Sequence, residues 1–172
     1  MFSWKMVRET AGFRVFVRLL RQVRLSHAVA MVALTLATSP ALAQGTMIIE
    51  DDRGGAVDAR VQLIQDYKSS DVHLEIRGRF CLSACTMFLG MKNVCVSPDT
   101  VFGFHGPSSA VYGIGLASKA FEYWSHVMAD HYPEPIKSWY LKDGRNRIVG
   151  FHEITGRGLI DLGVAECQSA WR

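Results

Sequence analysis

The sequence lacks three features that would assign its class at once: internal repeats, low-complexity tracts and a long apolar run. The apolar stretch at residues 28–37 is shorter than the roughly 20 residues that span a bilayer. Beyond residue 43 there is also no surplus of positive charge, because 13 basic residues face 15 acidic ones. With 172 residues, 49% of them hydrophobic, the chain is expected to form one soluble domain without a nucleic-acid partner.

The first 43 residues have the composition of a targeting segment. Six basic residues and one acid precede the apolar run, and the small residues of Ala41-Leu42-Ala43 follow it. A signal peptidase accepts this order, so we expect cleavage after Ala43 and a periplasmic or secreted chain of residues 44–172. The long basic region leaves open an uncleaved leader, which would anchor the protein to the inner membrane. Met31, inside the apolar run, leaves open a later start codon.

Cysteine is scarce, and all four cysteines follow the leader: Cys81, Cys85, Cys95 and Cys167. An even number in an exported domain indicates two disulfides, and three pairings are open. Zinc binding by Cys81, Cys85 and His105 is the alternative, but this spacing is a weak ligand pattern. The Cys81–Cys85 spacing also differs from the Cys-x-x-Cys of redox motifs. No metal or other cofactor is therefore expected.

Short apolar segments alternate with helical patterns after residue 45. The sequence predicts strands at residues 46–49, 72–76, 94–96, 101–104 and 164–167, the first of them buried. It predicts helices after Gly55, from Ser83 to about Met91, around residues 115–131, near residues 136–140 and at residues 155–162. This order indicates parallel crossover units, hence an α/β fold with a small, mainly parallel sheet and a C-terminal helical extension.

The helix expected around residues 115–131 carries two neighbouring apolar stripes. One consists of Leu116, Ala120, Tyr123 and Val127, and the other of Ala117, Phe121, Trp124 and Met128. So wide an apolar face exceeds what a surface helix needs, which indicates burial against a second surface such as another subunit. A homo-oligomer that forms through this helix is therefore expected.

Three features stand in the order that acyl-transfer chemistry needs. Gly54-Gly55 opens a helix, so backbone N–H groups there can approach an oxyanion, with Gly55 as the expected donor. Ser83 begins an apolar helix, and the N–H of Ala84 offers a second donor. His105 ends a strand between glycines, where its imidazole can accept the serine proton. Each feature alone is common in structural roles, as a helix cap, a turn or a strand end.

The order and spacing of these features resemble the Clp-type peptidases and the wider crotonase-like superfamily. Gly55 and Ser83 are 28 positions apart, and Ser83 and His105 are 22 apart. The matching segments are Arg53–Val57, Cys81–Cys85, Val94–Pro98 and Gly103–His105, with a looser match near the C-terminus. The pattern Cys-x-Ser-Ala-Cys-Thr with a later Gly-Phe-His is most similar to that of uncharacterised periplasmic Clp-like proteins of proteobacteria. The resemblance implies a nucleophile at Ser83 and a base at His105.

Two departures from the family pattern affect this interpretation. The position that matches the family's triad aspartate is Phe151, so no acid is carried over. The sequence leaves open a Ser–His dyad or Glu153 as the substitute acid, with His152, Asp143 and Asp161 as alternatives. The family also has strands and a helix before the strand at residues 46–49, and cleavage after Ala43 leaves no room for them. An exposed sheet edge, a covering partner or a truncated gene model are the three explanations.

These observations lead to two hypotheses of different class. The first is an exported serine hydrolase that cleaves a peptide or small ester through Ser83 and His105. The second is a catalytically inactive Clp-like fold that acts as a binding or assembly module through the helix around residues 115–131. The missing acid and the missing front strands favour the second hypothesis.

Overall fold

The computed structural model describes residues 45–111 and 113–168, so the predicted leader lies outside the described residues. The strands are β1 (Thr46–Ile49), β2 (His73–Ile76), β3 (Phe80–Leu82), β4 (Val94–Val96), β5 (Val101–Phe104) and β6 (His152–Thr155). The helices are α2 (Val57–Ser69), the 3-10 helix η1 (Ser83–Gly90), α3 (Ser118–Ala129), α4 (Ile136–Lys142), the 3-10 turn η2 (Gly144–Asn146) and α5 (Gly156–Asp161). Within these described ranges, no helix combines the length and apolar character needed to cross a membrane.

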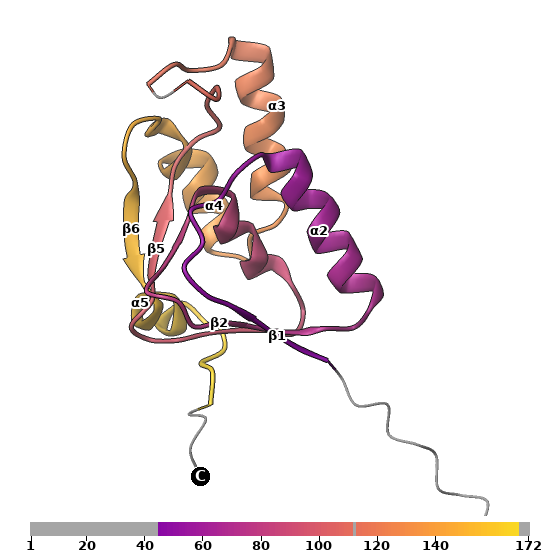
Figure 1. Ribbon diagram of the computed structural model, residues 1–172. Coiled ribbons are helices and arrows are strands. Elements are labelled where there is room, and N and C mark those ends of the chain that lie inside the picture. The colour runs from indigo at the N-terminus through magenta and orange to yellow at the C-terminus, as the bar shows by residue number, and fades with distance from the viewer. Residues whose placement is uncertain (1–44, 112, 169–172) are drawn as a thin grey trace, which may run out of the picture. The chain divides into compact units, whose positions relative to one another are not determined.

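The strands form two three-stranded sheets, and the chain passes from the first sheet directly into the second at several points (Figure 1). The first sheet has the order β1-β2-β4, and all of its pairs are parallel. In the second sheet, β5 lies between β3, which is parallel to it, and β6, which is antiparallel. Short connections lead from β2 into β3 and from β4 into β5, and Asp52 after β1 bridges to Cys81 in β3. Each of these three segments therefore runs from one sheet to the other.

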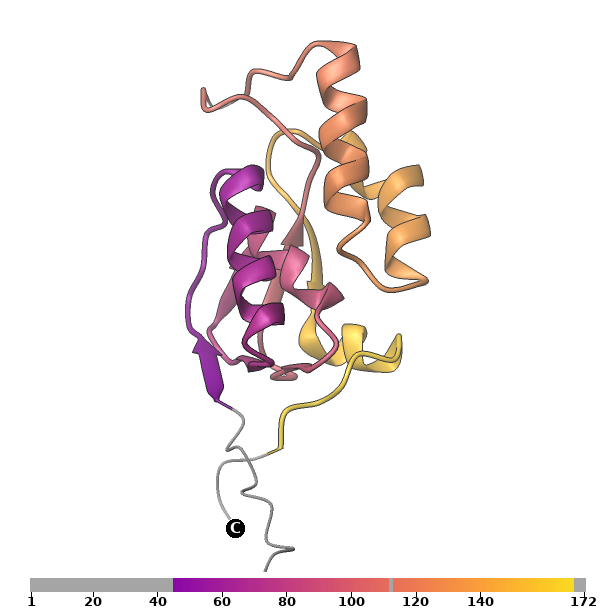
Figure 2. The same cartoon turned by 90° about the vertical axis from the view of Figure 1, so that its right-hand side faces the viewer.

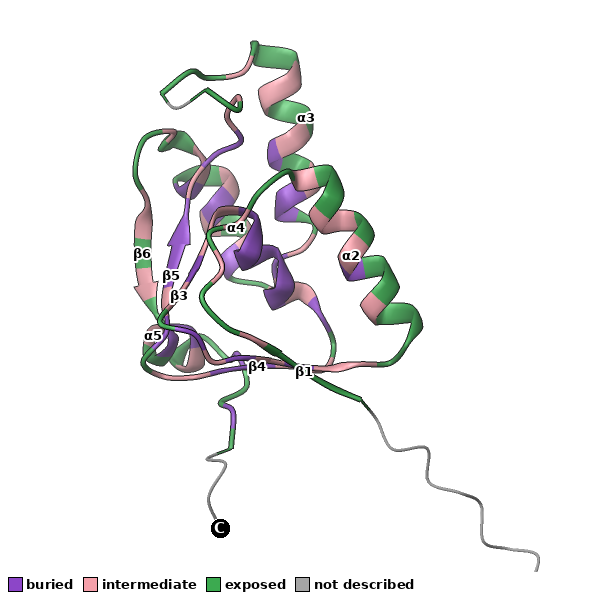
Figure 3. Ribbon diagram, viewed as in Figure 1, coloured by how far each residue is buried: buried purple, intermediate pink, exposed green. Residues whose placement is uncertain are grey.

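The hydrophobic core lies between the sheets and the helices. Leu74 and Ile76 alternate with half-buried residues along β2 and are fully buried. η1 is the most buried helix of the described chain, because six of its eight residues are buried. By contrast, α2 buries only Ile64, and its outer surface is largely exposed (Figure 3). The chain thus places the helix that begins with Ser83 at the centre of the fold.

The α3 helix is shorter than the predicted range of residues 115–131. Its buried residues lie in its second half, at Ser125, Met128 and Ala129, and it packs against α4 and η1. At right angles to the first view, α3 and α4 lie beside each other, away from β1 (Figure 2). Tyr123, from one of the predicted apolar stripes, is 61% exposed. Part of the apolar face is therefore covered within this chain and part faces outward.

The α/β class and the parallel pairing are confirmed, whereas several elements differ from the predictions. The second predicted helix is the 3-10 helix η1, and the preceding strand β3 was not predicted. Strand β6 was missed as well, because it reads His-Glu-Ile-Thr without an apolar alternation and, among the described residues, pairs with β5 alone. The predicted strand at residues 164–167 is wrong, since it forms a single bridge between Glu166 and Val96.

The burial predicted for residues 46–49 is also wrong. Met47 and Ile48 are 39% and 50% exposed, because β1 pairs with β2 alone within the described residues and forms the edge of its sheet. An edge strand leaves one row of backbone N–H and C=O groups free. Within the described residues, β1 is therefore an exposed edge of its sheet.

Candidate active site

Ser83 lies at the turn from β3 into η1. Its φ of 55° is in the left-handed region, which non-glycine residues seldom adopt. A side chain at Gly54 would meet this turn, since an ideal Cβ there would lie 2.6 Å from Ser83 Cβ and 2.9 Å from the N of Ala84. Gly54 itself has a φ of 96°. The lack of a side chain at Gly54 therefore allows the loop that contains Gly54 and Gly55, the glycine loop, to pack directly on Ser83.

His105 follows β5 and reaches the same point from the neighbouring strand. Leu82 at the end of β3 pairs with Gly103 in β5, so the residues that follow these parallel strands come close together. The distance from His105 Nε2 to Ser83 Oγ is 2.7 Å. The Tyr140 hydroxyl donates a hydrogen bond to the backbone oxygen of His105 at 3.2 Å. The predicted nucleophile and base are thus brought into hydrogen-bond contact.

Burial lowers the pKa of His105 below its usual 6.5, because desolvation disfavours the imidazolium. The backbone of Gly106 lies near the ring and opposes this shift in pKa, but it is the smaller effect. The imidazole is therefore neutral at pH 7, which is the form that can accept a proton from Ser83.

The other imidazole nitrogen has no polar partner among the described residues. Nδ1 of His105 is buried and makes no hydrogen bond. The ring of Phe151 lies against the imidazole instead, with centroids 5.3 Å apart and an interplanar angle of 71°. Glu153 is exposed on β6, opposite Gly103, and no hydrogen bond joins it to His105. The structure thus does not bring the predicted third residue to the histidine.

Backbone groups next to Ser83 are suited to stabilise an oxyanion. Ala84 is the second residue of η1, so its N–H has no acceptor within the helix. Gly55, the other predicted donor, lines the cavity beside Ser83, and an added Cβ there would meet nothing within 4 Å. Gly54, rather than Gly55, is the glycine that packs against the serine turn.

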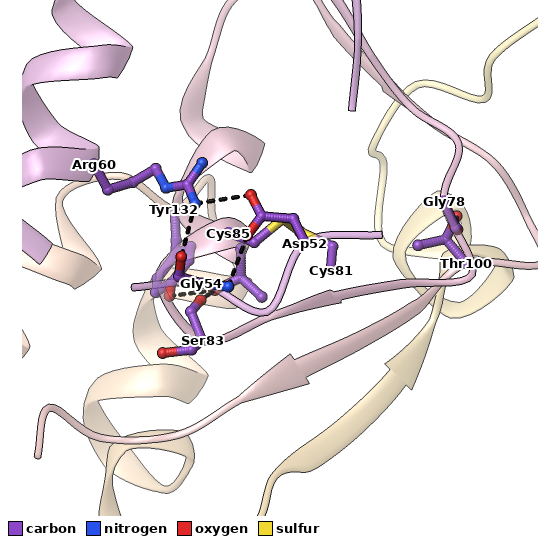
Figure 4. The surroundings of a disulfide bond; sticks show 10 residues. Asp52, Gly54, Arg60, Gly78, Cys81, Ser83, Cys85, Thr100 and Tyr132 are labelled. Carbon is purple, nitrogen blue, oxygen red and sulfur yellow. Dashed lines mark hydrogen bonds and ion pairs between the residues drawn. A yellow bond between two sulfur atoms is a disulfide. The ribbon is translucent and has the colours of Figure 1, made fainter. Parts of the chain in front are cut away.

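An ion pair that was not predicted from the sequence braces the loop at Gly54-Gly55. Asp52 accepts a hydrogen bond from the N–H of Gly54 at 2.7 Å, and Arg60 donates to the same carboxylate at 2.7 Å. Arg60 also donates to the carbonyl of Gly54 at 3.2 Å, and its side chain is only 10% exposed (Figure 4). The spacing of Asp52 and Arg60 gives no recognisable motif, so only their position after β1 and on α2 reveals their role.

A cavity of about 540 Å³ opens over the Ser83–His105 pair. The α2 end of its wall includes Gly55, Val57 and Asp58. Leu116, Trp124 and Met128 contribute apolar side chains from the region of α3, and residues 107–110 complete the wall. The pair therefore faces an accessible, mostly apolar cavity of a size suited to a small ligand or a peptide side chain.

The four cysteines form two disulfides, Cys81–Cys85 and Cys95–Cys167, which selects one of the three open pairings. The zinc alternative loses both thiolate ligands, because Cys81 and Cys85 are bonded to each other. Among the described residues, His73 and Glu75 also lie close to Cys95, but that sulfur belongs to the second disulfide. Neither group of side chains supports a metal site.

Comparisons with known proteins support the fold. No protein-family model and no curated protein matches the sequence. Among solved structures, the chain is similar to a mutant of a membrane-bound stomatin-specific protease, with a TM-score of 0.50 and 22% sequence identity. The likeness covers 70% of this chain, and this chain spans 62% of that protein. The chain therefore has a Clp-like fold.

Proposed function

We propose that this protein is an exported serine hydrolase that cleaves peptide or ester bonds through an acyl-enzyme formed on Ser83. One observation carries the proposal: Ser83 Oγ lies 2.7 Å from Nε2 of His105 at the base of an accessible cavity. A serine hydroxyl is a weak nucleophile, and a neutral base within hydrogen-bond reach is what activates it. The Clp-like fold, which a protease of known structure shares, supports acyl transfer as the reaction class. It does not identify the substrate.

Each step of the reaction can be assigned to a group in this site. Ser83 Oγ attacks the substrate carbonyl carbon, and its proton moves to Nε2 of His105. The carbonyl oxygen becomes an oxyanion next to the N–H of Ala84, with Gly55 as the second donor. His105 then gives its proton to the leaving amine or alcohol, and the acyl group stays on Ser83. In the second half of the reaction His105 accepts a proton from water, which attacks the acyl carbon. His105 then returns this proton to Ser83 Oγ as the acid product leaves.

The unpaired Nδ1 of His105 favours a second candidate, a binding or assembly module without catalysis. In serine hydrolases an acid at this position orients the imidazole and stabilises the imidazolium. Phe151 lies beside the ring here and does neither. The exposed Tyr123 on α3 and the free edge of β1 are surfaces that a second copy of the chain could cover. The hydrolase is therefore proposed as a Ser–His dyad, slower than a triad enzyme.

Export is part of the proposal. Two disulfides fit an oxidising compartment such as the periplasm, and the predicted cleavage after Ala43 would release a chain that begins just before β1. An inner-membrane anchor remains the alternative for an uncleaved leader. N-terminal sequencing of the protein recovered from the cell envelope distinguishes the two.

A fluorophosphonate probe tests the hydrolase directly, because it bonds covalently to an activated serine with loss of fluoride. The intact protein should be labelled, while Ser83→Ala and His105→Ala should show no labelling at this site. Ser109→Ala is the matched control, since Ser109 lines the same cavity but its hydroxyl bonds to the Val111 carbonyl and not to His105. Unlabelled wild-type protein, or equal labelling in Ser83→Ala, contradicts the hydrolase and favours the binding module.

A further inference from the structure

Ser83 is the central residue of a five-residue segment that the Cys81–Cys85 disulfide closes into a ring. The two Cα atoms lie 5.3 Å apart, and both cysteines are fully buried. Figure 4 shows the disulfide beside Ser83 and Gly54. The bond therefore spans the residue proposed as the nucleophile, with one residue between it and each cysteine.

Both ends of this ring are held by the core. Cys81 belongs to β3, where it pairs with Phe102 in β5 and bridges to Asp52. Cys85 lies in the first turn of the buried helix η1. The disulfide consequently ties the end of a strand to the start of a helix across the turn that carries Ser83.

The turn needs such support because Ser83 adopts a left-handed conformation. A non-glycine residue at φ 55° is held there only when its surroundings determine the backbone. The Thr86 hydroxyl donates to the carbonyl of Ser83 at 2.7 Å, and Gly54 packs against Ser83 Cβ and the N of Ala84. These contacts hold the backbone of the turn, and the disulfide fixes the distance between its ends.

We propose that Cys81 and Cys85 are positioning residues: their bond holds Ser83 Oγ within hydrogen-bond reach of His105. The inference rests on the proposed hydrolase function. A ring of five residues leaves little room for other backbone conformations, so opening it lets the turn relax toward the ordinary right-handed region. The hydroxyl then moves away from Nε2, and a misplacement of about 1 Å is enough to slow such chemistry by about 10²-fold.

The second disulfide of the chain provides a matched control. Cys95 lies in β4 and Cys167 near the C-terminus, 72 positions apart, and neither lines the cavity over Ser83. The entropy that a disulfide removes from the unfolded chain grows with the logarithm of the loop it closes. The long Cys95–Cys167 loop should therefore contribute about twice as much to stability as the short Cys81–Cys85 ring.

The test compares the full chain with two double variants, Cys81→Ala/Cys85→Ala and Cys95→Ala/Cys167→Ala. The rate of fluorophosphonate labelling at several probe concentrations gives the apparent dissociation constant KI of the probe and the maximal rate constant kinact. Thermal unfolding gives Tm. For Cys81→Ala/Cys85→Ala we expect kinact to fall roughly 10- to 100-fold with little change in KI. For Cys95→Ala/Cys167→Ala we expect about twice the loss of Tm, with kinact nearly unchanged.

A second measurement covers the case in which Cys81→Ala/Cys85→Ala does not fold. The Cys95→Ala/Cys167→Ala variant keeps one disulfide, which a phosphine reduces to two thiols that can be counted. Labelling should slow on reduction while the circular dichroism spectrum stays native. Equal kinact with and without the Cys81–Cys85 bond overturns the positioning role alone. Wild-type protein that is never labelled at Ser83 overturns the hydrolase function and this inference with it.

Discussion

Replacement of Phe151 by aspartate should convert the proposed dyad into a triad. Phe151 is half-buried and its ring lies 5.3 Å from the His105 imidazole, whose Nδ1 has no hydrogen-bond partner among the described residues. It also directly precedes β6, at the position across from His105 when the β5–β6 pairing is extended by one residue. Directly opposed residues have Cβ atoms about 5 Å apart, so a carboxylate at position 151 can approach Nδ1.

The magnitude follows from the charge that the variant introduces. A carboxylate about 4 Å from the imidazolium interacts by at most about 4 kcal/mol at an effective dielectric constant near 20. Partial exposure reduces this, so we expect the pKa of His105 to rise by about 1–3 units from its depressed value. The acid also stabilises the imidazolium during the reaction, and labelling should accelerate by roughly 10-fold or more. Loss of the half-buried ring should lower the free energy of unfolding by about 1–2 kcal/mol.

The assay is the pH dependence of kinact for wild-type, Phe151→Asp and Phe151→Asn protein. Asparagine has the shape of aspartate without its charge, so it removes the ring equally but should leave the pKa of His105 low. Phe151→Asp should be faster than Phe151→Asn, and its acid limb should move to higher pH. Equal rates and equal pH profiles for the two variants would refute the reasoning that a missing acid limits this site.

Two further predictions follow from the glycine loop and from the buried histidine. Gly54→Ala should abolish labelling and lower the free energy of unfolding by about 1–3 kcal/mol, because the added Cβ meets the Ser83 turn at a positive φ. Gly163→Ala is its control: it has nearly the same φ with nothing near the added Cβ, so it should be labelled normally. Because the pKa of His105 is below 6.5 in the folded protein, the unfolded chain binds more protons as the pH falls from 6.5 toward that value. The free energy of unfolding should therefore fall over this range, and less so in His105→Gln, as measured by urea unfolding at several pH values.

The positions of Ser83 and His105 were predictable because Ser83 begins an apolar helix, His105 ends an apolar strand, and their spacing resembles that of a known family. Strands that alternate with helices are joined by crossover connections and pair in parallel, and the residues that follow neighbouring parallel strands meet at one edge of the sheet. Strand β3 itself was not predicted, because Phe80-Cys81-Leu82 runs into the apolar helix η1 without a turn signal. The prediction of the site did not depend on β3, since it required only that Ser83 begin the helix.

Contacts across the chain could not be predicted in the same way. Gly54, and not Gly55, packs on the Ser83 turn, a difference that depends on the path of the loop. Asp52 and Arg60 brace that loop through their position in space, without a motif. The disulfide pairing likewise depends on the approach of β4 to the C-terminal segment, and β1 looked buried because its apolar composition does not reveal its position at an edge.

A burst experiment with p-nitrophenyl acetate tests the central claim, covalent catalysis by Ser83, most directly. We expect a rapid release of nitrophenolate of up to one equivalent per chain, with an acetyl group on the peptide that contains Ser83. The Ser83→Ala variant should show neither the burst nor the adduct. Wild-type protein without a burst, or with the acetyl group on another residue, would contradict the account.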